Sequence, residues 1–197
     1  MQILLNDHID EMSEAQVMQL IHSLPDWRRE KALRFKHLAG RRECAVAYRL
    51  LQQGLREYYG ITEPPHFIIG QHDKPTLQEH PSIHFNLSHC RTAVLCALSS
   101  QPIGVDIERR REGKEALVRH TMNEAEQQLI QSSQDPDMMF TRLWTAKEAV
   151  VKLTGEGLAC NIPDILTDAA AQGIIVTSTI NDEKGYAYSI AEYKTAP

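Results

Sequence analysis

The sequence predicts an α+β protein made of two similar α/β halves, residues 1–108 and 109–197. Helical spacing of apolar residues dominates as far as Tyr59, and short apolar or β-branched runs dominate from there to Glu108. Segments of the same two kinds then follow in the same order up to Tyr193. Helices, strands, helices, strands is an α+β pattern repeated once. No residue-level repeat accompanies this order, so we expect the halves to share topology alone.

Three helices are expected in the first half, over residues 13–23, 25–37 and 40–59. Ser13 and Gln16 form the pattern of a capping box at the start of the first helix. Pro25 suits the first turn of the second helix. Gly60 follows the third helix at the position where glycine commonly ends one.

Strands are expected over residues 67–69, 83–87, 92–98 and 103–108. The last two are joined by residues 99–102, a loop of hairpin size. The second half then predicts a charged turn over 109–115, helices over 123–132 and 136–154, and strands over 174–180 and 186–193.

Composition limits the classes of function. No apolar run approaches the roughly 20 residues of a membrane span, and the first residues do not form a signal peptide. The four cysteines lack the spacing of zinc sites, and we expect free thiols in a reducing cytoplasm: Cys44, Cys90, Cys96 and Cys160. A net charge of −5 argues against general binding to nucleic acid.

The charge distribution is more informative than its sum. Residues 28–56 hold nine basic and two acidic residues. A basic patch on an acidic protein favours a local anionic ligand over a long polyanion. Solvated helix faces with ion pairs four residues apart explain the same charges equally well.

The segment Ile103–Glu108 is the first candidate for chemistry. Its alternation places Asp106 and Glu108 on one face of a strand, roughly 7 Å apart. Two carboxylates at this spacing repel each other unless a divalent cation or a basic partner lies between them. A strand with a solvated acidic face is the alternative.

The helix over 136–154 offers a second set. Trp144, Glu148 and Lys152 share one face at spacings of four residues. An ion pair between Glu148 and Lys152 beside a core tryptophan is the simpler interpretation. If this face meets the acidic strand, three carboxylates and a lysine converge, which suits Mg²⁺ and a phosphate.

Ser88 and His89 end the strand that begins near Ile83. A hydroxyl, an imidazole and local backbone N–H groups can hold a phosphate, although a hydrogen-bonded turn is the common alternative. Adjacent residues on a strand end diverge, so the pair does not form a catalytic triad.

These pieces resemble, in order and spacing, the 4′-phosphopantetheinyl transferases of the larger, two-halved kind. The matching motifs are Asp73-Lys74-Pro75, Phe85-Asn86-Leu87-Ser88-His89, Gly104-x-Asp106-x-Glu108, Trp144-x-x-Lys147-Glu148-x-x-x-Lys152 and the basic run from Arg28 to Phe35. The pair of acidic motifs, about forty residues apart, is the most specific part.

The resemblance implies two similar halves around a central cleft that binds coenzyme A. It implies Mg²⁺ ligands at Asp106, Glu108 and Glu148, with Glu148 and Lys152 as the catalytic pair and Lys152 on the diphosphate. The remaining coenzyme A contacts that it implies are Arg28, Lys31, Ser88 and His89 at the 3′-phosphate, either Arg41 or Arg42, and Lys74 and Pro75 at the adenine. Glu126 matches a further acidic position, or it is the capping partner of Asn123. Asp73 departs from the family pattern, in which glycine precedes Lys-Pro.

The implied reaction is magnesium-dependent transfer of the phosphopantetheine arm to a serine of an apo acyl carrier protein or peptidyl carrier domain, in fatty-acid or secondary metabolism. Residues 109–135, including Arg109–Arg111, would meet the carrier, and a cytoplasmic monomer is expected. Two alternatives remain. One is a non-catalytic module that binds coenzyme A or a carrier protein. The other is a different phosphoryl-transfer enzyme, although the chain lacks a P-loop or a G-x-G-x-x-G motif.

Overall fold

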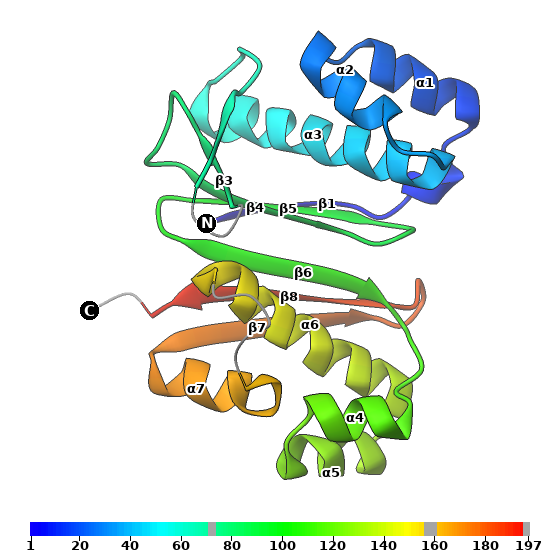
Figure 1. Cartoon of the computed structure of the whole chain (residues 1–197), viewed down its shortest axis with the longest axis vertical. Helices are drawn as coiled ribbons and strands as arrows, with labels where there is room; N and C mark the ends of the chain where they lie inside the picture. Colours follow the sequence, from blue (N-terminus) through cyan, green and yellow to red (C-terminus); the bar gives the residue numbers. More distant parts are fainter. Residues whose placement is uncertain (71–73, 156–160, 195–197) are drawn as a thin grey trace.

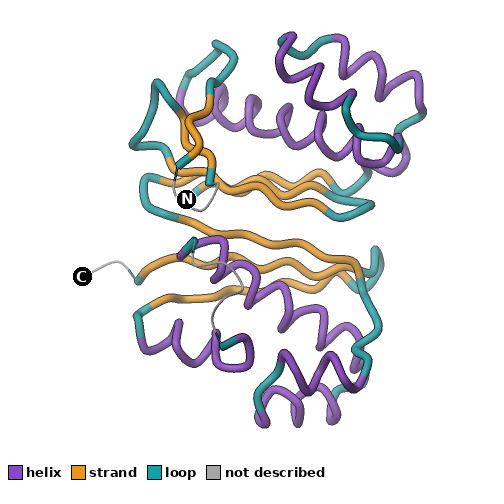
Figure 2. Tube along the Cα trace, in the orientation of Figure 1, coloured by secondary structure: helices purple, strands orange, loops and turns teal. Residues whose placement is uncertain are grey.

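The computed structural model describes residues 1–70, 74–155 and 161–194. Two three-stranded antiparallel sheets lie next to each other in the middle of the molecule (Figure 1). The helices of the first half lie above the first sheet, and those of the second half lie across and below the second sheet (Figure 2). The mixed helix and sheet architecture expected from the sequence is confirmed.

The first sheet has the strand order β1-β5-β4. Its strands are β1 (Gln2–Asn6), β5 (Val94–Ser99) and β4 (His84–His89), and its helices are α1 (Glu14–His22), α2 (Asp26–Leu33) and α3 (Leu38–Tyr59). The capping box of Ser13 and Gln16 begins α1, and Gly60 ends α3 with a positive φ of 69°. The second helix stops at Leu33, four residues before the expected end at His37.

The second sheet has the order β6-β8-β7. Its strands are β6 (Ile103–Arg109), β8 (Tyr186–Tyr193) and β7 (Ile174–Asn181), and its helices are α4 (Glu115–Thr121), α5 (Glu124–Ser132), α6 (Pro136–Thr154) and α7 (Ile165–Ala171). Because β6 pairs with β8, the strand expected at the end of the first half belongs to the sheet of the second half.

The loop of hairpin size between β5 and β6 does not form a hairpin. These consecutive strands lie in different sheets, and the chain crosses from one sheet to the other over residues 100–102. The edge of β6 instead faces β4, where side chains replace a backbone ladder. Asn86 Oδ1 accepts from the Val105 N–H at 2.9 Å, and Ser88 Oγ accepts from the Ile107 N–H at 3.3 Å. These contacts satisfy edge N–H groups that would otherwise be buried without partners.

Apolar residues fill the space between the two sheets. Leu95 and Ala97 of β5 are fully buried in one cluster with Val105 and Ile107 of β6. A second cluster lies between α3 and the first sheet, and a third packs α6 and α7 on the second sheet. This packing fixes which residues of β6 face the first sheet and which face α6. It therefore determines the direction of the acidic side chains.

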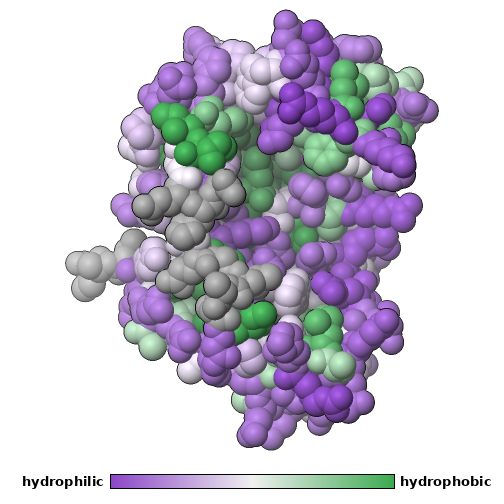
Figure 3. Space-filling view, viewed as in Figure 1, coloured by the Kyte–Doolittle hydropathy of each residue, from purple (hydrophilic) through white to green (hydrophobic). Residues whose placement is uncertain are grey.

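A short ribbon projects beside the first sheet. It pairs β2 (Phe67–Ile69) with β3 (Pro75–Leu77) and carries the exposed side chains of Ile68 and Ile69. These residues belong to the hydrophobic patch over this ribbon in Figure 3. Within the described residues, no helix is both long and apolar enough to cross a bilayer.

Candidate functional site

A pocket of about 360 Å³ lies where β4, β6 and α6 meet. It is polar and open to solvent, and both acidic motifs of the sequence contribute to it. Its lining consists of Leu87, Ser88, His89, Asp106, Glu108, Arg111, Trp144, Glu148 and Lys152. The strand face and the helix face that the sequence singled out therefore meet in one place.

Gly104 explains why α6 comes so close to β6. A Cβ atom at this position would lie 2.1 Å from the Ala149 carbonyl oxygen and 2.5 Å from the Leu153 backbone nitrogen. Only glycine allows this approach. Since Glu148 and Lys152 adjoin those two residues on α6, the contact places them over the acidic face of β6.

Asp106 is 5% exposed and lies at the centre of the pocket's hydrogen bonds. Its Oδ1 atom accepts from Lys152 Nζ at 2.6 Å and from Ser88 Oγ at 2.8 Å. Lys152 thus forms an ion pair across the pocket to β6, in place of the simpler pairing with Glu148 along the helix. The second oxygen, Oδ2, is buried and has no hydrogen-bond partner in the described part of the chain.

Glu108 and Glu148 have raised pKa values. Burial is the main cause for both carboxyl groups, and the negative charge of Asp106 adds to it. The positive charges of Arg111 and Lys152 act in the opposite direction on both pKa values without cancelling the rise. The raised values follow from burial together with the neighbouring negative charge in the same pocket.

This donor set fits a hard divalent cation. Mg²⁺ prefers carboxylate oxygens and keeps water and phosphate oxygens in its shell, and Asp106 Oδ2 is a buried oxygen without a partner. This fit rests on the kind of ligand atoms present and not on a preformed coordination geometry. Among residues 1–70, 74–155 and 161–194, no three acidic, histidine or cysteine side chains are arranged closely enough to form a coordination site.

A second pocket, of about 300 Å³, adjoins the first and shares Leu87 and Lys152 with it. Lys74, Pro75 and Asn86 also line it. Lys74 Nζ donates to the carbonyl oxygens of Lys152 at 2.7 Å and of Leu153 at 3.3 Å, and burial lowers the pKa of this ammonium. Lys74 therefore ties the β2–β3 ribbon to the last turn of α6. Asp73 lies outside the described residues, as does Cys160.

Ser88 and His89 line the first pocket, whereas the arginines and the lysine expected at the 3′-phosphate lie outside the linings of both pockets. Arg28 is buried, donates to the Cys44 carbonyl at 3.0 Å and packs over the ring of Tyr48. Arg42 is also buried and donates to the Arg91 carbonyl at 3.0 Å. The Nε atoms of both arginines are buried without a hydrogen-bond partner among the described residues. Lys31 is exposed.

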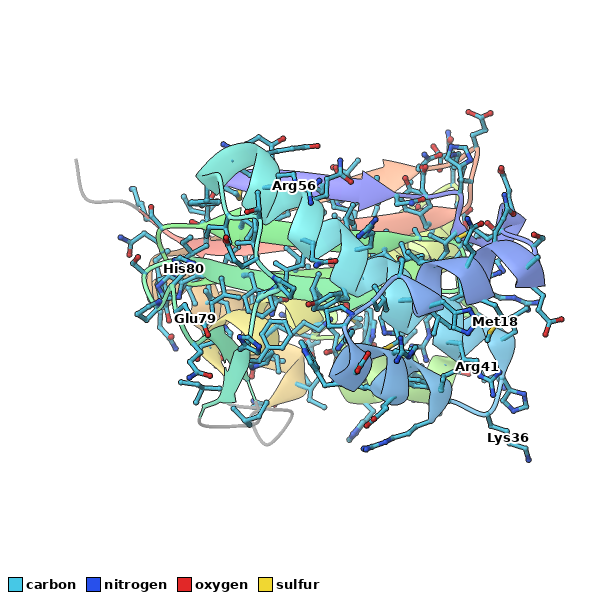
Figure 4. All side chains as sticks on the ribbon, turned by 90° about the horizontal axis from the view of Figure 1, so that it is seen from above. Met18, Lys36, Arg41, Arg56, Glu79 and His80 are labelled. Carbon is cyan, nitrogen blue, oxygen red and sulfur yellow. The ribbon has the colours of Figure 1, made fainter. Side chains whose placement is uncertain are left out.

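The two neighbouring arginines of α3 point to different places. Arg42 reaches the turn that follows His89, whereas Arg41 donates through Nε to the Phe35 carbonyl at 2.9 Å. Figure 4 shows Arg41 near Lys36 at the edge of the helical layer. Arg42 is therefore the arginine closer to the end of β4. His89 itself is exposed and lies 3.4 Å from Glu43.

Arg111 is a lining residue that sequence reasoning assigned to a different surface. Its guanidinium lies 5.5 Å from the Trp144 ring centre and 5.8 Å from that of Phe140, at cation–π distance. The only sequence signal was its position in a basic run directly after the acidic strand. Trp144 is half-buried and supports Arg111 at the rim of the pocket.

Glu126 and Lys147 form a buried ion pair of 2.9 Å between α5 and α6. Glu126 also completes the capping box with Asn123, so the capping role left open by the sequence is confirmed. Lys147 is 1% exposed and donates further to the carbonyl oxygens of Ile162 and Pro163. Within the motif on α6, Lys147 thus anchors the helix while Glu148 and Lys152 line the pocket.

Comparison with known proteins adds to this geometry. Residues 102–196 match the model of the 4′-phosphopantetheinyl transferase superfamily. The chain is 31% identical over 137 residues to a 4′-phosphopantetheinyl transferase of Bacillus subtilis, covering 67% of this chain and 60% of that protein. It is 31% identical to the 4′-phosphopantetheinyl transferase HetI of Nostoc sp., covering 76% and 67%. It is 29% identical to 4′-phosphopantetheinyl transferase psf-1 of Bacillus pumilus, covering 83% and 72%.

Proposed function

Because this chain belongs to the 4′-phosphopantetheinyl transferase superfamily, we propose that it transfers the phosphopantetheine arm of coenzyme A to a carrier protein. One observation carries the proposal: Asp106, Glu108, Glu148 and Lys152 line a single pocket beside that of Lys74 and Pro75. The match spans 60% of the length of the Bacillus subtilis relative, so activity and partners rest on this site and not on the name alone.

In the proposed reaction, a serine hydroxyl of the carrier attacks the diphosphate phosphorus that bears the pantetheine arm. A new O–P bond forms, the P–O bond to the adenosine phosphate breaks, and adenosine 3′,5′-bisphosphate leaves with the electron pair. The demands are positioning and neutralisation of charge on the leaving phosphate. Mg²⁺ held by Asp106, Glu108 and Glu148 would supply part of that neutralisation.

Lys152 is proposed to contact the diphosphate. An ammonium group has three N–H donors, and two of them bind Asp106 and Ser88. The third remains for a phosphate oxygen. Arg111 is a second cation at the same pocket, held on the ring of Trp144.

Glu148 is proposed to accept the serine proton, directly or through water. Because a carboxylate that holds Mg²⁺ is a weak base, the route through a water molecule is favoured.

The remaining contacts are proposed from the family to which the chain belongs. The pocket of Lys74 and Pro75 would take the adenine, and Arg28, Lys31, Arg42 and His89 the 3′-phosphate. The two unpartnered Nε atoms, of Arg28 and Arg42, support an anionic ligand near the start of α3. Residues 109–135 would meet an apo acyl carrier protein or peptidyl carrier domain, and the protein would act as a cytoplasmic monomer with coenzyme A in the cleft between its halves.

The test is to mix the protein with apo acyl carrier protein, coenzyme A and Mg²⁺ and to weigh the carrier by mass spectrometry. A gain equal to one phosphopantetheine arm is expected, and it should be lost in Asp106→Ala and Glu148→Gln or with a chelator. Binding of coenzyme A without any gain, on this carrier and on an apo peptidyl carrier domain, would instead identify a non-catalytic module.

A further inference from the structure

Ser88 lies on β4 at the line where the two sheets meet, and it is 5% exposed. Its hydroxyl donates to Asp106 Oδ1 at 2.8 Å. It accepts from the Ile107 N–H at 3.3 Å and from Lys152 Nζ at 3.0 Å. Since Lys152 Nζ also binds the same Asp106 oxygen, at 2.6 Å, the three side chains form a closed triangle.

A serine hydroxyl has one donor and two acceptor positions. In Ser88 all three are filled by protein groups. A phosphate has only acceptor oxygens at its anionic face, so it needs the single donor that Ser88 gives to Asp106. The resemblance to the transferase family assigns Ser88 to the 3′-phosphate, and these hydrogen bonds point to a different role.

We infer that Ser88 is a positioning residue that orients Asp106 and Lys152, and that it is not a ligand of the 3′-phosphate. By holding Oδ1 of Asp106, it leaves the buried Oδ2 as the oxygen that is open to a further partner. By accepting one N–H of Lys152, it fixes the direction of the others. This inference rests on the proposed transferase function.

Asn86 offers a matched control for the structural part of this role. It lies two residues earlier on β4 and accepts from the Val105 N–H at 2.9 Å, so it makes the same kind of link to β6. It has no hydrogen bond to Asp106 or Lys152 among the described residues. The fall in melting temperature of Asn86→Ala therefore measures the loss of one such link without disturbing the triangle.

The experiment compares Ser88→Ala and the volume-conserving Ser88→Cys with the wild type, using coenzyme A and dephospho-coenzyme A, which lacks the 3′-phosphate. We expect kcat to fall by about tenfold or more with both substrates and in the same proportion, because a displaced Lys152 acts on the diphosphate that they share. Affinity for adenosine 3′,5′-bisphosphate, measured by calorimetry without metal, should stay unchanged. The melting temperature should fall no further than in Asn86→Ala.

Two results would overturn the inference. A loss confined to coenzyme A, with weaker binding of the bisphosphate, would show that Ser88 contacts the 3′-phosphate. Wild-type turnover of both substrates by both variants would show that the hydroxyl is dispensable. Inactivity of the wild type itself, on either substrate, would instead refute the transferase function, so the two failures are told apart in one assay.

Discussion

Gly104→Ala tests the close approach on which the site depends. The added Cβ would lie 2.1 Å from the Ala149 oxygen and 2.5 Å from the Leu153 nitrogen, both backbone atoms that cannot rotate away. Ordinary contact begins near 3.4 Å, so α6 must move away from β6 by about 1 Å.

This movement should affect activity more than stability. Overpacking of a core typically destabilises a protein by about 1–3 kcal/mol. Glu148 and Lys152 are next to the two clashing residues and move with them, and a misplacement of about 1 Å lowers a rate by about 100-fold. We expect both effects in Gly104→Ala.

Gly54→Ala is the matched control, because its Cβ would also overpack a core, 2.4 Å from Leu98 Cδ1 and 2.9 Å from Leu4 Cδ1. Those atoms are ends of side chains between α3 and the first sheet, away from the pocket. Urea denaturation should show both variants destabilised, while the transfer rate per folded molecule falls only in Gly104→Ala. Equal rates in the two variants would refute the reasoning.

Three further predictions concern stability. Lys147→Met leaves the buried Glu126 carboxylate unpaired and should lower the free energy of unfolding in urea by about 3–5 kcal/mol; a loss below about 1 kcal/mol would contradict a buried pair. Tyr186→Phe removes the hydrogen bond to the Asp7 carboxylate at 2.8 Å and the one accepted from Asn181 at 3.2 Å. Calorimetry should show a loss of about 1.5–3 kcal/mol, the range for a hydrogen bond to a charged group, and an unchanged transition would speak against these bonds. Burial raises the pKa of Glu148, so the folded state binds protons more tightly and loses stability as pH rises through that pKa. Glu148→Gln without metal should therefore raise the melting temperature at neutral pH, with the gain vanishing below the ordinary glutamate pKa of 4.5, and a gain independent of pH would exclude this cause.

Local patterns were sufficient for the long elements. The helix ending at Gly60 and the helix ending at Gly155 both stop at a glycine with positive φ, as glycine caps predict. The strand Gln2–Asn6 was not predicted, because Gln-Ile-Leu-Leu-Asn has no alternation and depends on pairing with β5. The helix α7 was also missed, because a single stretch of seven residues gives little periodicity.

The sequence predicted the acidic residues of the site, but it did not predict the hydrogen bonds that join them to other elements. Alternation along β6 was enough to put Asp106 and Glu108 on one face, and both line the pocket. The partner of Ser88 lies 18 residues further along the chain, and that of Lys152 lies 46 residues earlier. Such contacts arise from the packing of two sheets and a helix, and no local sequence pattern predicts that packing. The placement of β5 and β6 in different sheets has the same origin, because a short loop does not say whether its strands share a sheet.

The account depends most on a single cation shared by Asp106 and Glu108 of β6 and Glu148 of α6. Electron paramagnetic resonance with Mn²⁺ as a substitute for Mg²⁺, in the presence of coenzyme A, measures this directly. The wild type should bind one Mn²⁺ tightly, and Asp106→Ala and Glu148→Gln should each abolish that tight binding while leaving the fold intact. Tight binding that survives in either variant would contradict a site formed jointly by the strand and the helix.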